Sequence, residues 1–173
     1  MPLFRSLLSI SACGLLAGCM AAPYLEPEGP GLATLVIDNE SIDPLEAATY
    51  VSGDTCSAKR SLHPGIPLGG PHIVKVSGGK PFTLWTKSVR AFTSHNEPIG
   101  RLTGVGICSG SLTFTPLPGR RYVARFRMEP DKDGLQRSSG SCYAQVAEEI
   151  RLPNGSLRRT AQPYRWRTES ACQ

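Results

Sequence analysis

The sequence predicts an all-β domain, an antiparallel two-sheet β-sandwich of the immunoglobulin-like kind with about nine short strands and little helix. Segments rich in β-branched and aromatic residues recur along the chain, and turn-forming residues separate them about every 8 to 12 residues. No long segment has convincing helical periodicity. Residues 31–173 are enough for a single domain that buries about two thirds of its unfolded surface.

The first half of the domain alternates apolar runs with glycine and proline. Residues 31–38 form an apolar, β-branched run that predicts a strand buried on nearly both faces. We expect two further strands at 47–53 and 56–62. Residues 63–71 contain so many turn formers that we expect no regular element there.

Two more strands are expected on either side of a glycine turn, followed by a less regular segment. These strands cover 72–76 and 80–92, joined by Ser77-Gly78-Gly79. Residues 100–108 are rich in glycine, which predicts a loop or a bulged strand.

The second half contains two predicted hairpins. In the first, 112–116 and 122–128 flank Pro118-Gly119, and their alternation predicts a core row of Tyr122, Ala124, Phe126 and Met128 opposite Arg121, Val123, Arg125 and Arg127. Residues 142–152 fit a helix or a strand, but the following Asn154-Gly155 favours a tight hairpin turn and therefore a strand paired with 157–167.

The N-terminus has the layout of an export signal. Residues 1–5 include one arginine, residues 7–16 are mostly apolar, and Ala17 and Gly18 are small. The apolar run is shorter than the roughly 20 residues that a membrane-spanning helix needs. We therefore expect removal of the segment.

Leu16-Ala17-Gly18-Cys19 resembles the lipobox of bacterial lipoproteins. This resemblance implies cleavage before Cys19, a diacylglycerol on its sulfur and, because Met20 follows it, a periplasm-facing position on the bacterial outer membrane. Ile10-Ser11-Ala12-Cys13 fits a loose lipobox, but it would leave only about seven apolar residues before the cut. The alternative is that Cys19 is a small apolar residue of a plain signal or anchor.

The expected organisation is a signal peptide at 1–18, a flexible tether at 19–30 and the domain at 31–173. The tether prediction comes from proline, glycine and alanine without apolar periodicity. Within the domain, Gly70, His72 and Val76 resemble the strand of PEGA-type sandwich modules, although the Pro-Glu-Gly-Ala signature is absent. That resemblance implies a binding or structural module.

Cysteine usage predicts two disulfides. The sequence has six cysteines, and the signal and the lipid remove Cys13 and Cys19 from the pool. The remaining set is Cys56, Cys108, Cys142 and Cys172, which allows three connectivities. We favour Cys56 with Cys108 and Cys142 with Cys172, because the second pair closes a short loop. No two of these cysteines have the close spacing of a zinc site.

The net charge of +5 arises from arginines that gather late in the chain. The candidate face for an anionic partner consists of Arg121, Arg125, Arg127, Arg165 and Arg167. Its partner could be an envelope protein, a glycan such as peptidoglycan, or an anionic lipid. A solvated strand face is the alternative interpretation. Nucleic acid is not expected, because no binding motif accompanies the charge.

No constellation of residues predicts catalysis, a metal or a cofactor. Gly106–Gly110 mimics a nucleophile elbow around Cys108, but no helix is expected to follow it. Residues 129–134 begin like a calcium loop, yet Gly140 occupies the twelfth position, where a carboxylate is needed. His63, His72 and His95 are too far apart in sequence to indicate a local site.

The expected function is that of a lipid-anchored, non-enzymatic structural or binding module. The alternative is a periplasmic inhibitor or sensor that binds an enzyme or a glycan through loops such as 63–71 or 100–110. A hydrolase is the third class, and it would need a histidine beside a nucleophile in the fold.

Overall fold

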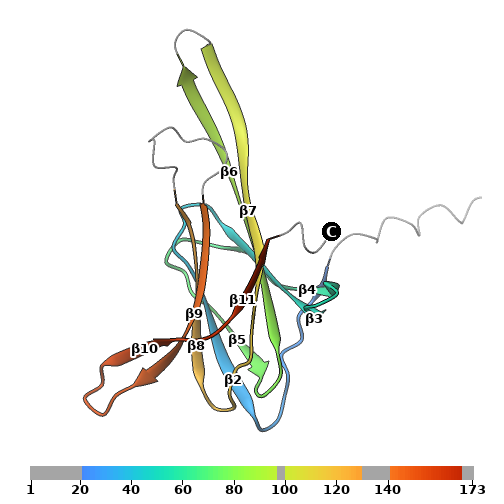
Figure 1. Ribbon diagram of the computed structural model, residues 1–173, viewed down its shortest axis with the longest axis vertical. Helices are drawn as coiled ribbons and strands as arrows, with labels where there is room; N and C mark the ends of the chain where they lie inside the picture. The colour runs from blue at the N-terminus through green and yellow to red at the C-terminus, as the bar shows by residue number, and fades with distance from the viewer. Residues whose placement is uncertain (1–20, 97–99, 130–140, 169–173) are drawn as a thin grey trace, which may run out of the picture.

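The computed structural model describes residues 21–96, 100–129 and 141–168, and it confirms the two-sheet β-sandwich (Figure 1). Sheet A has the strand order β1 (Ala22–Pro23), β4 (Ser57–Ile66), β3 (Leu45–Ser52), β6 (Phe82–Asn96), β7 (Gly100–Phe114) and β11 (Arg165–Thr168). Sheet B has the order β10 (Leu157–Ala161), β9 (Ser141–Arg151), β8 (Arg121–Glu129), β2 (Leu32–Asn39) and β5 (His72–Ser77).

Both sheets are mixed, which corrects the expectation of purely antiparallel sheets. β1 pairs with β4 in parallel, and β2 pairs with β8 in parallel, while the other neighbours are antiparallel. Parallel neighbours need a long connection between them, so β2 and β8 are far apart in sequence. Local alternation along a strand does not reveal such a partner.

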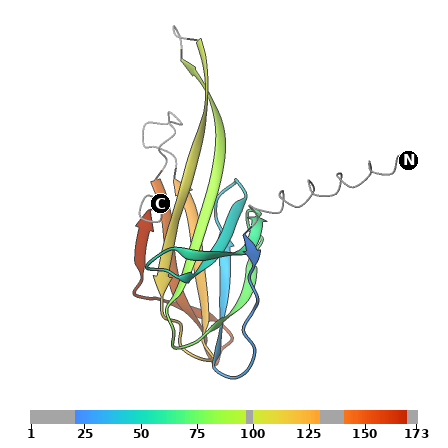
Figure 2. The same ribbon diagram turned by 90° about the vertical axis from the view of Figure 1, so that its right-hand side faces the viewer.

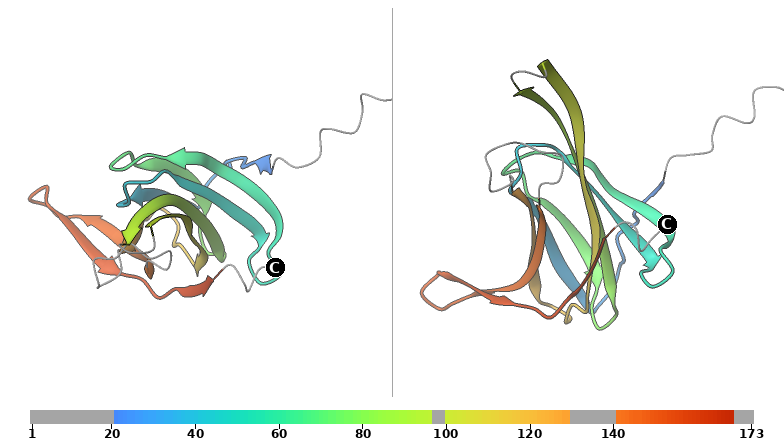
Figure 3. Two further views of the ribbon diagram at one scale, coloured as in Figure 1. Left: turned by 90° about the horizontal axis from the view of Figure 1, so that it is seen from above. Right: turned by 45° about the horizontal axis from the view of Figure 1, so that its top comes forward.

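The core lies between the facing sheets (Figure 3). The largest fully buried side chains include Leu35, Ile37, Tyr122 and Phe126. The predicted core row is confirmed, since Ala124 is also buried and Met128 packs against the same cluster. Alternation along β8 places this row inward.

The predicted hairpin between 112–116 and 122–128 is wrong, because β7 belongs to sheet A and β8 to sheet B. The connection contains Pro116 and Pro118, which offer no backbone N–H for a ladder. It crosses the sandwich instead, where the Pro116 carbonyl accepts from Gly79 N at 2.7 Å and Tyr122 Oη accepts from Leu117 N at 2.9 Å.

A segment in which no regular element was expected is a strand, and so is 100–108, for which a loop or a bulged strand was expected. Residues 63–66 belong to β4, where the register against β3 shifts between Ala47↔His63 and Leu45↔Ile66. Pro64 and Gly65 lie in this bulged stretch, which explains how a proline is tolerated within a paired strand. Residues 100–108 form a continuous part of β7.

The predicted Asn154-Gly155 turn joins β9 to β10 and is confirmed. Gly155 has a φ of 81°, a conformation that side chains disfavour, and its N–H donates to Leu152 O at 2.9 Å. β10 ends at Ala161, however, and the chain then enters sheet A as β11. A Cβ at Gly110 of β7 would collide with the Trp166 ring, so this glycine allows β11 to pack closely.

The expected flexible tether at 19–30 must be corrected at Ala22–Glu26. Ala22 and Pro23 pair with Arg60 and Ser61 of β4, and Tyr24 packs against the core. The segment lacks apolar periodicity, but one half-buried tyrosine together with backbone pairing holds it to the domain.

Candidate interaction sites

The clearest candidate site is a two-stranded arm formed by residues 89–96 of β6 and 100–107 of β7. Both strands extend well past the body of the sandwich (Figures 1 and 2). β3 pairs with β6 only as far as Ser88, and β11 pairs with β7 only from Gly110. Among the described residues, the arm strands therefore pair with each other alone, from Val89↔Ile107 to Asn96↔Gly100.

At the base of the arm, one face is aliphatic and exposed. Val89, Val105 and Ile107 have exposed fractions of 46%, 58% and 56%. Val89 lies opposite Ile107, and the exposed Ala91 lies opposite Val105, so alternation places all four on one face. We call these four residues the arm patch.

An ion pair fixes the root of the arm. Arg90 Nε donates to Asp43 Oδ2 at 2.6 Å, and both side chains are less than one fifth exposed. Asp43 is itself held by the buried Asn39, whose amide donates to Asp43 O and to Ile66 O, each at 2.9 Å. Arg90 alternates with the arm patch, so this pair secures the opposite face.

A disulfide between Cys108 and Cys142 crosses the sandwich at the same root. It joins β7 of sheet A to β9 of sheet B, and it corrects the expected pairs Cys56–Cys108 and Cys142–Cys172. Sequence spacing favoured a short loop, whereas the fold places β7 beside β9 over a separation of 34 residues. Cys56 is also disulfide-bonded, and Cys172 lies outside the described residues.

The five arginines of the candidate anionic-partner face do not lie together. Arg121, Arg125 and Arg127 occupy the outer face of β8 in sheet B, and Arg165 and Arg167 lie on β11 in sheet A. The sequence could not reveal this separation, because similar alternation occurs in strands of either sheet.

Most of these arginines have acidic partners. Arg121 Nε lies 2.8 Å from Glu149 Oε1, Arg125 Nε lies 3.4 Å from Glu40 Oε1, and Arg127 stacks on the Tyr143 ring at 5.3 Å. Glu149 is 6% exposed and also binds Arg159 at 3.0 Å. The outer face of sheet B is thus a network of compensated charges.

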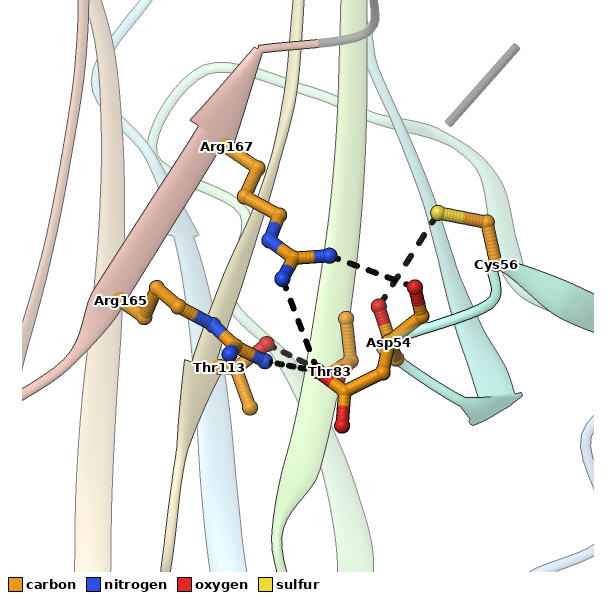
Figure 4. Close-up of polar contacts among 7 residues, drawn as sticks. Asp54, Cys56, Thr83, Thr113, Arg165 and Arg167 are labelled. Carbon is orange, nitrogen blue, oxygen red and sulfur yellow. Dashed lines mark hydrogen bonds and ion pairs between the residues drawn. The ribbon is translucent and has the colours of Figure 1, made fainter. Parts of the chain in front are cut away.

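A second cluster joins β11 to the turn between β3 and β4. Arg165 Nη2 lies 2.5 Å from Asp54 Oδ1, and Arg167 Nη2 lies 3.6 Å from the same oxygen (Figure 4). Beside them, the Thr83 and Thr113 hydroxyls share a hydrogen bond of 2.9 Å. This cluster borders an open cavity of about 820 Å³ whose lining includes Tyr50, Asp54, Tyr164 and Arg165. Its lining combines polar and apolar side chains.

The histidines show no nucleophile–base pair in the described part of the structure. The His63 and His72 rings lie 4.8 Å apart, between β4 and β5, and His63 Nδ1 accepts from Gly65 N at 3.0 Å. Burial, reinforced by His63, lowers the pKa of His72. The side chain of His95 lies outside the described residues.

The other motifs do not form a site. Cys108 of the elbow-like Gly106–Gly110 is bonded to Cys142, so it offers no thiolate. Residues 130–140 of the calcium-like segment lie outside the described residues. Across the described part of the chain, no three His, Cys, Asp or Glu side chains are placed to hold a metal ion.

The arm was not predicted from the sequence, although the sequence contains a signal for it. Segments of equal length, 82–96 and 100–114, flank a short connection, and Val89-Arg90-Ala91 and Val105-Gly106-Ile107 alternate toward one face. The glycines in 100–110 obscured this alternation.

Comparison with known proteins identifies no relative of this chain. No family model matches the chain, and no curated protein or solved structure resembles it significantly. Within the described residues, no helix has the length and apolar character needed to cross a membrane.

Proposed function

We propose that this protein is a lipid-anchored, non-enzymatic binding module that faces the periplasm from the bacterial outer membrane and holds another envelope protein through the arm. The anchor rests on the resemblance of Leu16–Cys19 to a lipobox. The arm patch is the observation that carries the binding role, because it exposes aliphatic side chains on a ribbon rooted by a disulfide and an ion pair.

The exposed strand edges and apolar side chains of the arm favour a protein partner. A two-stranded ribbon in water is marginally stable on its own, and contiguous exposed apolar side chains mark interaction surfaces. Within the described residues neither outer edge of the arm pairs with another strand, so both edges offer backbone N–H and C=O groups to which a partner strand can add. A partner with an extended, apolar segment would satisfy the edge and the patch together.

Capture from detergent-extracted membranes tests the arm. The arm variant carries Val89→Thr, Val105→Thr and Ile107→Thr, which keep a branched shape and remove apolar surface. The matched variant carries Arg121→Gln, Arg125→Gln and Arg127→Gln on sheet B. We expect the arm variant to lose at least about tenfold of the captured partner, equivalent to about 1.4 kcal/mol, and the arginine variant to retain it. The reverse result would move the binding site to sheet B and contradict the proposal.

An inhibitor or sensor is the second candidate. The arm contains 100–107, part of a segment expected to bind in that role, and it projects from the body with its base fixed by the disulfide. In that case the captured partner is an enzyme whose activity falls when the soluble domain is added. A captured partner with unchanged activity would favour a structural role.

The anchor has its own test. Intact-protein mass spectrometry should show a chain that begins at Cys19, carries diacylglycerol and has lost four hydrogens to two disulfides. Replacing Cys19 with Ala should release the domain from the membrane fraction. Retention of the Cys19→Ala variant in that fraction would overturn the proposed anchor.

A further inference from the structure

We propose, on the basis of the lipid anchor above, that the N-terminal segment Ala22–Glu26 straps the domain directly onto the lipid head groups, with the β1–β4 edge of sheet A as the membrane-facing surface. We call this segment the strap. The occupant of that surface is the phospholipid head-group layer into which the acyl chains on Cys19 would insert.

The strap is joined to both sheets. Ala22 pairs with Arg60 of β4, and Tyr24 N donates to Ser61 O at 2.8 Å. Tyr24 Oη then donates to Lys75 O of β5 at 2.8 Å, and the Glu26 carboxylate accepts from Lys75 N at 3.1 Å. The strap therefore crosses from the edge of sheet A to the edge of sheet B.

Tyr24 is the fixed point of the strap. Its ring meets the Phe82 ring edge-on at 6.4 Å, and burial raises the pKa of Tyr24 to about 12. A tyrosine that is half withdrawn from water and donates its hydroxyl proton to a backbone carbonyl is anchored by packing and by a hydrogen bond. The chain is thus held to the domain from Ala22 onward.

The strap begins so soon after Cys19 that it limits how far the domain can lie from the bilayer. Ala22 is the third residue after Cys19, and an extended chain spans at most about 3.6 Å per residue, so the two Cα atoms are within about 11 Å. A flexible tether over 19–30 would have reached about 40 Å on the same rule. The polar layer of a bilayer is about 5 to 8 Å thick on each side, so Ala22 must lie in this layer or just outside it.

The exposed side chains along this edge fit a lipid surface. Leu25 is 82% exposed, although it follows the anchored Tyr24, and Ala22 and Pro23 are exposed as well. Arg60 lies opposite Ala22 and supplies positive charge, while Glu26 is engaged by the backbone of Lys75. Exposed apolar side chains on the strap and a cation on the neighbouring β4 suit an interface with anionic phospholipids.

The arrangement also leaves the arm free. β1 lies beside β4 on the flank of the body, well away from the far end of the arm and on the opposite side from β10 (Figures 1 and 2). A domain seated on its β1–β4 edge therefore presents the arm patch to a partner without removing the strap.

Photo-crosslinking to lipid tests the orientation. A photoreactive amino acid replaces Arg60 in the full, lipidated protein, reconstituted in vesicles of phosphatidylethanolamine and phosphatidylglycerol. The matched probe replaces Arg158 of β10, an exposed arginine on a strand on the other side of the body. We expect lipid adducts at position 60 to exceed those at 158 by at least about tenfold, because Ala22 holds position 60 against the head groups.

A spacer variant provides the control for distance. A Gly-Ser segment of about 20 residues between Met20 and Ala21 adds a root-mean-square reach of about 25 Å. It should reduce the adducts at position 60 to the level of position 158. Equal adducts at both positions in the parent protein, or unchanged adducts in the spacer variant, would overturn the orientation.

The mass of the reconstituted protein separates this proposal from the anchor on which it rests. An unmodified Cys19 would overturn the anchor and the orientation together. A diacylated Cys19 with no excess of adducts at position 60 would overturn the orientation alone.

Discussion

The two projecting hairpins of the sandwich are the β6–β7 arm and the β9–β10 hairpin. They differ in the side chains that they expose to water. The β9–β10 hairpin is short, closes on an Asn154-Gly155 turn, and links its strands through Glu149 and Arg159. The arm is longer, bears the aliphatic patch, and is fixed at its root by Cys108–Cys142 and Arg90–Asp43.

The difference indicates which hairpin is adapted to water without a binding partner. A charged strand with a favourable turn is adapted to solvent and discourages pairing with other chains. The arm carries none of that protection on its patch, while its root is strongly fixed. We infer that the root serves to present the arm.

The largest effect is expected at the root of the arm. The double variant Cys108→Ser with Cys142→Ser should lower the free energy of unfolding by about 3 to 4 kcal/mol, because the bond closes a loop of 34 residues. Urea unfolding without reductant measures the loss. A loss below about 1 kcal/mol would contradict the assigned role of the bond. Peptide mapping of the parent should join Cys108 to Cys142 and Cys56 to Cys172.

The second effect concerns the charged base of the β9–β10 hairpin. Glu149→Gln should cost about 1 to 2 kcal/mol, because a carboxylate that is 6% exposed loses charge-assisted bonds to Arg121 and Arg159. Arg125→Gln is the matched control, since its contact to Glu40 is longer and more exposed, and it should cost less than about 0.5 kcal/mol. Equal losses in the two variants by thermal or urea unfolding would refute the central role of Glu149.

A third test addresses the turn of the same hairpin. Gly155→Ala should cost about 1 kcal/mol through backbone strain alone, because φ is 81° and a Cβ there meets no atom within 4 Å. Gly65→Ala is the control, because its φ is not positive and its Cβ would only touch Pro44 at 3.5 Å. A Gly155 variant as stable as the Gly65 variant would show that the turn does not need this conformation.

The smallest effect on stability is expected at the arm patch. Val89→Thr with Ile107→Thr should change the free energy of unfolding by no more than about 0.5 kcal/mol, because both side chains are about half exposed. Val76→Thr buries a hydroxyl at a fully covered position and should cost about 1 to 3 kcal/mol. A large loss in the patch variant would mean that the patch packs within the protein, which would contradict its role as a free surface.

Features that depend on neighbouring residues could be predicted from the sequence. The strand near 31–38 was predicted because its apolar run is continuous, and the β9–β10 turn because Asn-Gly favours one backbone shape. The core row from Tyr122 to Met128 followed from alternation along one strand.

Features that depend on distant partners could not be predicted. The apparent hairpin around Pro118-Gly119 crosses between sheets, and the parallel neighbour of β2 lies far along the chain. The disulfide pairing failed for the same reason, because it follows the packing of β7 against β9. The arginines of the candidate face lie apart because β11 belongs to sheet A, whereas β8 belongs to sheet B. The arm could not be predicted because glycines interrupt the alternation of apolar and polar residues in 100–107.

The parallel contact of β2 with β8 has a consequence for the order in which the chain folds. The hydrogen bond from Met128 N to Ser41 Oγ, 2.8 Å long, joins residues separated by 87 positions at the ends of these strands. Contacts of such high sequence separation slow folding, because the intervening chain must be ordered before they form. In a chain synthesised from its N-terminus, the pairing of β2 with β8 must wait until β8 has been made, and during that interval the apolar face of β2 is exposed to aggregation.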